Sequence, residues 1–127
     1  MDQDKEKILL SVIVPCFNEI KTLDKVINNI QNSPVDPKEI IIVDDYSKDG
    51  SREFLKKINS KNIKTIFHDK NLGKGAALFS GISKARGEII IIQDADLEYD
   101  PNEYPTIISP IINDKADVVY GSRFQGG

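Results

Sequence analysis

Hydrophobic residues along this chain fall into short uninterrupted runs that are separated by polar segments. Four runs are rich in β-branched residues and a weaker fifth follows them; they cover residues 8–14, 40–43, 63–67, 88–92 and 117–120. Their apolar residues stand at successive positions rather than at alternate ones. This pattern predicts strands that are covered on both faces, as in a parallel sheet.

Between these runs, apolar residues recur at the spacing of a helix. Such stretches cover residues 20–30, 51–58, 75–85 and 101–113. In the first stretch one face collects Ile20, Leu23, Val26, Ile27 and Ile30. For the second we expect Asp49 or Ser51 as the N-cap. In the fourth, Pro101 suits the first turn, whereas Pro105 and Pro110 interrupt the helix.

Strand and helix patterns alternate along the whole sequence, at intervals of roughly 25 residues. This alternation predicts right-handed strand–helix–strand units in one α/β domain, with a mostly parallel central sheet between layers of helices. The expected fold class is therefore a Rossmann-like three-layer sandwich. Hydrophobic residues make up 39% and charged residues 29%, which is typical of a folded domain, and no repeat or linker divides residues 1–127.

The charged and sulfur-containing residues exclude several kinds of site. The formal net charge is −3, from 17 basic and 20 acidic side chains, so we do not expect the chain to bind nucleic acid. The single cysteine, Cys16, excludes an internal disulfide and a cysteine-only zinc site. The single histidine, His68, excludes a histidine-rich metal site. We expect Cys16 to be a small buried side chain and His68 to have a structural role.

The sequence contains no stretch that is long enough to cross a bilayer as a helix, which takes about 20 apolar residues. The first apolar run is too short for a signal peptide and is soon stopped by Pro15. We therefore expect any membrane attachment to come from sequence beyond residue 127. Because the sequence ends at Gly126-Gly127, shortly after a strand and with no closing helix, we also expect these residues to be part of a larger protein.

Polar residues follow the predicted strands at the point where each strand ends, which is where open α/β sheets bind their ligands. Three segments are therefore candidate walls of one site: residues 15–19, Asp44-Asp45 and Asp94-Ala95-Asp96. Carboxylates spaced like Asp94 and Asp96 suit Mg²⁺ or Mn²⁺ together with a nucleotide diphosphate, but the same spacing also fits two turn-forming aspartates. Asp44 and Asp45 could accept hydrogen bonds from a base or a ribose, although turn and cap residues fit their surroundings better.

Two further segments contain candidates for binding phosphate. Residues 71–77 place glycines around Lys74 at the start of a helix, where backbone N–H groups can hold an anion. Close helix packing is the other explanation for these glycines, and their spacing is not that of a P-loop. Arg123 follows the last strand and could either bind a phosphate in a bidentate way or lie in solvent as a surface residue.

In their order and spacing, the polar blocks resemble those of the family 2 glycosyltransferases, which have the GT-A fold. The blocks are residues 11–19, 42–51, 71–77, 93–98 and 121–124. The similarity is greatest to the polyprenyl-phosphate branch, which contains dolichol-phosphate mannose synthases and dolichyl-phosphate glucosyltransferases. The resemblance implies that residues 1–127 are the nucleotide-sugar-binding part and that the acceptor-side half follows them.

The resemblance also implies roles for individual residues. The implied nucleotide-binding residues are Pro15, Phe17, Glu19, Asp44, Asp45, Lys74 and Gln93. The implied ligands of Mg²⁺ or Mn²⁺ are Asp94 and Asp96 of an Asp-x-Asp motif, with Glu98 as a third. The implied catalytic residues are Asp94, Asp96 and Arg123. Among these, Asp45 would contact the base, Lys74 would lie near the donor, and Arg123 would face the acceptor phosphate.

The implied activity is an inverting transfer of a hexose from a UDP- or GDP-sugar to a polyprenyl phosphate or a glycan. A phosphate acceptor is already ionised and needs no strong general base, and the sequence offers no clear one, which favours the phosphate. The implied location is the cytoplasm, at the cytoplasmic face of a membrane for the full-length protein. Two alternatives are a non-catalytic nucleotide-binding fragment and a sugar-nucleotide nucleotidyltransferase, which would call for a loop rich in glycine and arginine after the first strand.

Overall fold

The computed structural model describes residues 7–95 and the backbone of residues 118–120. In this part of the chain the strands are β1 (Leu10–Cys16), β2 (Lys38–Asp44), β3 (Ile63–Phe67), β4 (Ile89–Ile92) and β5 (Val118–Tyr120). The helices between them are α1 (Ile20–Gln31), α2 (Ser51–Lys56) and α3 (Lys74–Ser83). None of these described helices is both long and apolar enough to cross a membrane.

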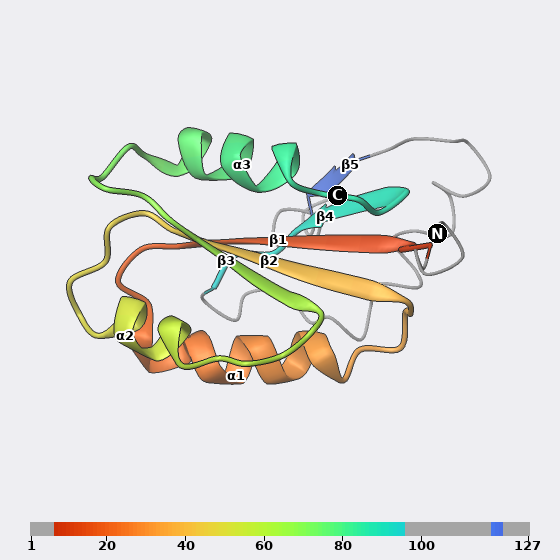
Figure 1. Ribbon diagram of the computed structural model, residues 1–127, viewed down its shortest axis with the longest axis horizontal. Coiled ribbons are helices and arrows are strands. Elements are labelled where there is room, and N and C mark those ends of the chain that lie inside the picture. The colour runs from red at the N-terminus through yellow and green to blue at the C-terminus, as the bar shows by residue number, and fades with distance from the viewer. Residues whose placement is uncertain (1–6, 96–117, 121–127) are drawn as a thin grey trace.

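The strands form one sheet in the order β3-β2-β1-β4-β5, and each neighbouring pair is parallel (Figure 1). The chain builds the sheet outward from β1 to β3 and then returns to place β4 on the other side of β1. The strand order therefore reverses between β1 and β4. In open α/β sheets such a reversal leaves a crevice at the carboxyl ends of the two strands.

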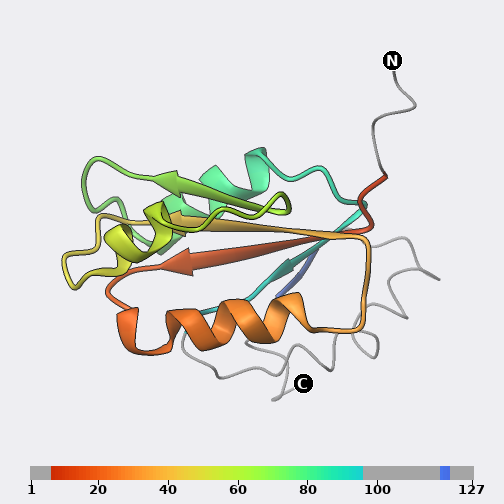
Figure 2. The same cartoon turned by 60° about the horizontal axis from the view of Figure 1, so that its bottom comes forward.

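Helices cover both faces of the sheet, with α1 and α2 on one face and α3 on the other (Figures 1 and 2). Alternate residues of β1 supply the two cores, because successive side chains of a strand point to opposite faces. Val12 and Val14 belong to the core that contains Leu23 of α1. Ile13 belongs to the core that contains Ala77 of α3. The predicted three-layer α/β sandwich with a parallel sheet is confirmed.

The predicted strands and helices in the described residues differ from the observed ones by no more than two residues at either end. The expected N-cap of α2 is wrong, because Gly50 with a φ of 105° occupies that position. Asp49 acts from one residue earlier, since its carboxylate accepts hydrogen bonds from the N–H of Ser51 and from the N–H of Ile20 at 3.0 Å each. Asp49 thus ties the starts of α1 and α2 together. The helix expected over 101–113 lies outside the described residues.

Helix α3 approaches the sheet closely at Gly81. A Cβ atom at this position would lie 2.5 Å from Cγ2 of Ile13 and 3.2 Å from Cγ2 of Val43. A Cβ atom at Gly73 or Gly75, by contrast, would meet nothing within 4 Å. Close packing therefore requires glycine at position 81, and it does not explain the glycines of the 71–77 segment.

We expect Gly81→Ala to lower the free energy of unfolding by about 1–3 kcal/mol, because the added methyl group overpacks the space beneath α3. Gly75→Ala is the matched control on the same helix. It should leave stability unchanged or raise it by up to about 1 kcal/mol, since alanine favours helix. Urea denaturation of both variants measures the difference, and equal effects of the two substitutions would contradict this account of the packing.

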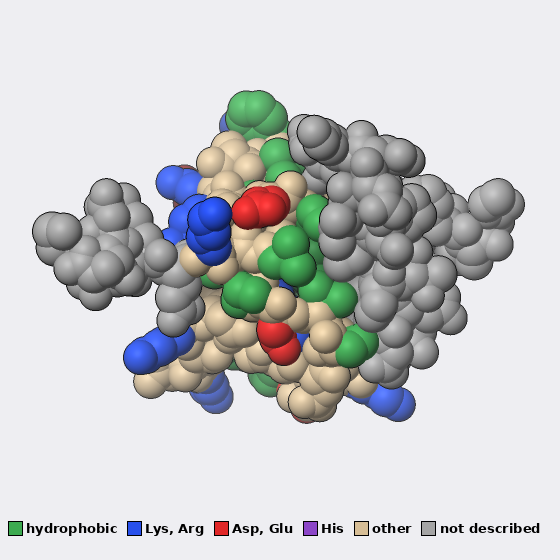
Figure 3. Space-filling model, turned by 90° about the vertical axis from the view of Figure 1, so that its right-hand side faces the viewer, with side chains coloured by type: hydrophobic (Ala, Val, Ile, Leu, Met, Phe, Trp, Pro, Cys, Tyr) green, Lys and Arg blue, Asp and Glu red, His purple; other side chains and the backbone are tan. Residues whose placement is uncertain are grey.

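Glu39 is a buried acid at the end of the sheet opposite to the carboxyl ends of the strands. On that end of the molecule, basic and acidic side chains are interspersed on the surface (Figure 3). The Glu39 carboxylate accepts hydrogen bonds from the hydroxyl of Ser11 and from the N–H of Arg86, each at 2.6 Å. Burial raises the pKa of Glu39, but these hydrogen bonds outweigh it and hold the pKa below its ordinary value of 4.5. Glu39 therefore joins β2 to β1 and to the segment that leads into β4.

Because the pKa of Glu39 is lowered in the folded state, its contribution to stability is present above pH 4.5 and is lost as the pH falls further. We expect Glu39→Gln to reduce the free energy of unfolding by about 1–3 kcal/mol at neutral pH. The loss of stability between about pH 5 and about pH 3 should also become shallower than in the wild type. Urea denaturation over a pH series tests this, with exposed Glu53→Gln as the control. An unchanged pH dependence in Glu39→Gln would be the contrary result.

Candidate functional site

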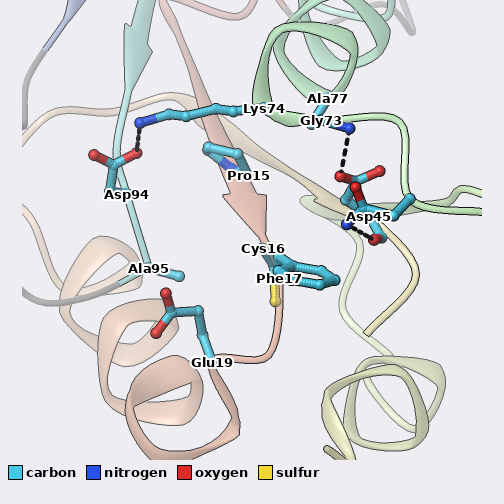
Figure 4. A pocket seen from close by; sticks show the side chains of 11 residues that line it. Pro15, Cys16, Phe17, Glu19, Asp45, Gly73, Lys74, Ala77, Asp94 and Ala95 are labelled. Carbon is cyan, nitrogen blue, oxygen red and sulfur yellow. Dashed lines mark hydrogen bonds and ion pairs between the residues drawn. The ribbon is translucent and has the colours of Figure 1, made fainter. Parts of the chain in front are cut away.

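A pocket of about 540 Å³ opens at the carboxyl ends of β1, β2 and β4, where the strand order reverses (Figure 4). Small-molecule sites commonly have volumes of roughly 300–1,000 Å³. The pocket is lined by Pro15, Cys16, Phe17, Glu19, Asp45, Asn71, Gly73, Lys74, Ala77, Asp94 and Ala95. The structure therefore brings together most of the nucleotide-binding residues that the sequence indicated in this part of the chain.

The loop after β1 is held in place by the loop after β2. Asn18 has a φ of 55°, and its N–H donates a hydrogen bond to Oγ of Ser47 at 2.8 Å. The side-chain oxygen of Asn18 accepts a hydrogen bond from the N–H of Lys48, also at 2.8 Å. These reciprocal bonds fix the segment that carries Phe17 and Glu19 on the pocket wall. Phe17 is 48% exposed and lines the pocket, so it is available to a ligand.

The carboxylate of Asp45 is surrounded by hydrogen-bond donors. Its Oδ1 accepts a bond from the N–H of Leu72 at 2.8 Å and lies 2.9 Å from Nδ1 of His68. Its Oδ2 accepts a bond from the N–H of Gly73 at 2.8 Å. Burial raises the pKa of Asp45, but the hydrogen bonds outweigh it and the pKa lies below its ordinary value. Asp45 is therefore ionised at neutral pH and shapes the loop before α3, while its contact with a base stays a prediction.

Two of the expected nucleotide-binding residues do not line the pocket. Asp44 is fully buried, and its Oδ2 accepts hydrogen bonds from the N–H of Ser47 at 3.0 Å and from Nη1 of Arg52 at 2.9 Å. Its Oδ1 has no hydrogen-bond partner among the described residues. Gln93 is only 1% exposed. Asp44 thus acts in the turn after β2, and a direct contact of either residue with a nucleotide stays a prediction.

Lys74 and Asp94 form an ion pair across the pocket. Nζ of Lys74 lies 2.8 Å from Oδ1 of Asp94, and the two side chains are 41% and 13% exposed. Figure 4 shows Lys74 reaching past Pro15 from the start of α3 to the end of β4. Gly73 has a φ of 98°, which favours glycine and lets the chain turn into the helix directly before Lys74. A cation and a carboxylate are thereby placed side by side in the pocket.

The segment after β4 is anchored to α1. The hydroxyl of Thr22 donates a hydrogen bond to the carbonyl oxygen of Ala95. Figure 4 shows the carboxylate of Glu19 pointing toward Ala95, on the same side of the pocket as Asp94. The remaining expected residues of this site, Asp96, Glu98 and Arg123, lie outside the described residues. The structure therefore describes the first aspartate of the Asp-x-Asp motif and the wall around it.

Asp94 is the described part of the expected metal site. Within residues 7–95 and 118–120, no three His, Cys, Asp or Glu side chains converge to hold a metal ion. The Asp94 carboxylate nevertheless suits a hard cation, because it places oxygen ligands on the pocket wall. Asp94 thus fits Mg²⁺ or Mn²⁺ as one ligand.

Cys16 lies against the pocket as a buried thiol, as predicted. It is 1% exposed, and burial, together with the charge of Asp44, raises the pKa of Cys16 to about 12. The thiolate is the reactive form of cysteine, so a neutral thiol of this kind is inert. Cys16 is therefore a packing residue rather than a nucleophile.

Sequence reasoning assigned no individual role to several residues that shape the pocket, although three of them lie in segments that it had indicated. They are Asn18, Thr22, Ser47, Ser80 and Asn71, of which Asn71 lines the pocket itself. Their partners are far away in the sequence; Asn18 and Ser47, for example, are separated by 29 positions. Only Asn18 carried a local signal, because asparagine tolerates a positive φ. His68, which was expected to be structural, lies within hydrogen-bond distance of Asp45 and Ser80.

The sequence is similar to a protein-family model and to several known proteins. The family model for glycosyl transferase family 2 matches residues 11–127. The UDP-N-acetylglucosamine–dolichyl-phosphate N-acetylglucosaminyltransferase of Methanococcus voltae is 35% identical in an alignment 134 positions long, which covers 92% of this chain and 53% of the relative. The dolichol-phosphate mannosyltransferase of Pyrococcus furiosus is 34% identical over 120 residues, which cover 93% of this chain and 34% of the relative. The chain therefore spans about half or less of the length of these relatives.

A solved structure shows the same fold. The mannosyltransferase PcManGT from Pyrobaculum calidifontis, in complex with GDP-Man and Mn²⁺, matches with a TM-score of 0.64 and 28% sequence identity. The match covers 78% of this chain and 30% of that chain. The GT-A fold implied by the sequence is thus confirmed. Since the family model extends over nearly the whole sequence, the chain belongs to glycosyltransferase family 2.

Proposed function

We propose that this chain is the donor-binding part of an inverting glycosyltransferase that takes a hexose from a UDP- or GDP-sugar. The observation that carries the proposal is the pair of Lys74 and Asp94, 2.8 Å apart in a pocket at the reversal of strand order. The ammonium group suits the oxygens of a diphosphate, and the carboxylate suits a divalent cation. A nucleotide diphosphate with its metal ion needs both groups at one place.

The relatives support this class of donor and a polyprenyl-phosphate acceptor. The names of two of them contain dolichyl or dolichol phosphate, one of these also names a UDP-sugar, and the solved structure holds GDP-Man and Mn²⁺. We extend these classes to the full-length protein and propose that it works at the cytoplasmic face of a membrane. Membership of the family also favours glycosyl transfer over the nucleotidyltransferase alternative.

Different described residues would bind different parts of the donor. The exposed ring of Phe17 offers an apolar surface to the base or ribose. The diphosphate would lie at the start of α3, where the helix dipole and backbone N–H groups favour an anion. A Cβ atom at Gly75 would meet nothing within 4 Å, so there is open space for a ligand in front of this turn. Lys74 would then bind the phosphate oxygens directly.

Asp94 would hold Mg²⁺ or Mn²⁺ together with Asp96 and Glu98, which lie outside the described residues. When bound, the ion would act as a Lewis acid toward the charge that develops on the leaving diphosphate. The acceptor oxygen would attack the anomeric carbon of the sugar while the bond between that carbon and the diphosphate breaks. The configuration at the anomeric carbon would therefore invert. A phosphate acceptor is already ionised and needs no general base; we propose Arg123 as the residue that binds it.

A second candidate is a nucleotide-binding fragment without catalytic activity. One observation favours it: the chain covers only 53% and 34% of the two relatives. In that case the pocket would bind the donor, but the full-length protein would carry out no transfer. The two candidates share the donor site and differ only in the outcome of a transfer assay.

We expect UDP or GDP to bind at least tenfold more tightly in the presence of Mn²⁺ than in its absence, because the ion and Lys74 share the charge of the diphosphate. Asp94→Asn should abolish the gain from Mn²⁺. Lys74→Gln should weaken nucleotide binding by about tenfold or more with and without the ion, since it removes a charge-assisted hydrogen bond. Isothermal titration calorimetry measures these affinities.

The control for Asp94→Asn is Asp24→Asn, which neutralises an exposed aspartate of α1 and should keep the full effect of Mn²⁺. Binding that is equally strong with and without Mn²⁺ in the wild type would count against the metal site. Loss of the Mn²⁺ effect in Asp24→Asn would show that the effect arises elsewhere.

Transfer itself is tested with the full-length protein, labelled UDP-glucose or GDP-mannose, and a polyprenyl phosphate. We expect a labelled polyprenyl-phosphate sugar to form, and Asp94→Asn to lower its rate by about a hundredfold or more because the metal ligand supports the leaving group. The same assay on residues 1–127 should give no product. Donor binding without transfer by the full-length protein would favour the non-catalytic candidate.

A further inference from the structure

His68 connects two parts of the pocket wall without lining the pocket itself. It follows β3 and is 8% exposed. Its Nδ1 lies 2.9 Å from Oδ1 of Asp45, and its Nε2 lies 2.9 Å from Oγ of Ser80. Its backbone is held on both sides, because its N–H donates to the carbonyl oxygen of Asp44 and its own carbonyl accepts from Nη1 of Arg52, each at 2.9 Å. The imidazole therefore forms a fixed bridge between the end of β2 and the middle of α3.

The ionisation of Asp45 determines which ring nitrogen carries hydrogen. An ionised carboxylate can only accept hydrogen bonds, so Nδ1 of His68 must be the donor. In the neutral imidazole, Nε2 then accepts a bond from the hydroxyl of Ser80; in the protonated form, Nε2 donates to the same oxygen. Both forms keep both contacts. The bridge is therefore kept in either protonation state of the imidazole.

The bridge reaches the donor site through the loop before α3. Besides His68, Asp45 binds the N–H groups of Leu72 and Gly73 at 2.8 Å each. Gly73 directly precedes Lys74, and Ser80 lies further along the same helix. The helix is thus held at a point before Lys74 and at a point after it. These two points set the place from which the Lys74 side chain crosses the pocket to Asp94.

We propose that His68 is a positioning residue for the donor site, which orients Lys74 toward Asp94 by holding Asp45 on one side and Ser80 on the other. The inference rests on the proposed function, because Lys74 and Asp94 are assigned to the donor there. His68 and Ser80 do not line the pocket, so they act through Asp45 and α3 rather than on the substrate.

The test uses four variants of the full-length protein: His68→Ala, His68→Asn, His68→Gln and Ser80→Ala. The amide of asparagine can take the place of Nδ1 and donate to Asp45, whereas the amide of glutamine reaches the place of Nε2 near Ser80. Two quantities are measured. Calorimetry gives the affinity for UDP and for GDP with Mn²⁺, and amide hydrogen exchange at Leu72 and Gly73 reports the loop without any ligand.

We expect His68→Ala to weaken nucleotide binding about tenfold, because small displacements of a positioned group cost that much or more. Exchange at the amides of Leu72 and Gly73 should become faster in the same variant. His68→Asn should restore most of the nucleotide affinity and most of the protection of these amides from exchange, since it keeps the bond to Asp45. His68→Gln should restore less of each quantity. Ser80→Ala should weaken binding by about threefold, since it removes one neutral hydrogen bond.

Asp69→Asn is the matched control, because Asp69 is the exposed neighbour of His68. It should leave the affinity and the amide exchange unchanged. Circular dichroism below the melting temperature shows whether each variant is folded. A purely structural role of His68 would lower the melting temperature and leave the nucleotide affinity of the folded variant as in the wild type.

The inference would be overturned if folded His68→Ala had the nucleotide affinity of the wild type, or if amide exchange at Leu72 and Gly73 were unchanged in it. If the wild type binds neither UDP nor GDP, the proposed function fails, and amide exchange alone decides the position of the loop. Faster exchange in His68→Ala, without faster exchange in Asp69→Asn, would then support the claim that His68 holds the loop before α3. Unchanged exchange in His68→Ala would overturn that claim.

Discussion

The reversal of strand order between β1 and β4 determines where a ligand can bind to this chain. All described strand pairs are parallel, so the carboxyl ends of the strands meet at one edge of the sheet. At the reversal, the chain leaves β1 toward α1 on one face and reaches β4 from α3 on the other. None of the described helices lines the space between the two strand ends along its whole length, and segments that are far apart in the sequence line a pocket there.

The aspartates at this edge have different roles, because some of them accept hydrogen bonds from backbone N–H groups and one pairs with a side chain. Loops that pass close to a pocket leave N–H groups that require acceptors. Asp45 supplies acceptors for Leu72 and Gly73, and Asp49 supplies them for Ser51 and Ile20. These residues build the walls. Asp94 instead pairs with a lysine side chain inside the pocket, which places it where a donor diphosphate and its metal ion would lie.

Much of the fold could be predicted from the sequence, because strands and helices in this chain follow local periodicity. The described elements lie within two residues of their predicted ends. Lys74 and Asp94 could be selected as candidates from their places at a helix start and a strand end. What could not be predicted is pairing over distance: His68 meets Asp45 and Ser80, 23 and 12 positions away, and nothing local marks those partners. The same holds for Gly81, whose need for glycine comes from Ile13 beneath it.

The central claim is that the pocket at the strand reversal binds a nucleotide diphosphate with a divalent cation at Asp94. Anomalous X-ray diffraction from crystals of the full-length protein grown with Mn²⁺ and UDP or GDP tests it most directly. The account predicts a manganese peak bonded to the Asp94 carboxylate, with the diphosphate at the start of α3 in contact with Lys74. A manganese ion and a nucleotide bound elsewhere on the protein, with the pair of Lys74 and Asp94 unchanged, would contradict it.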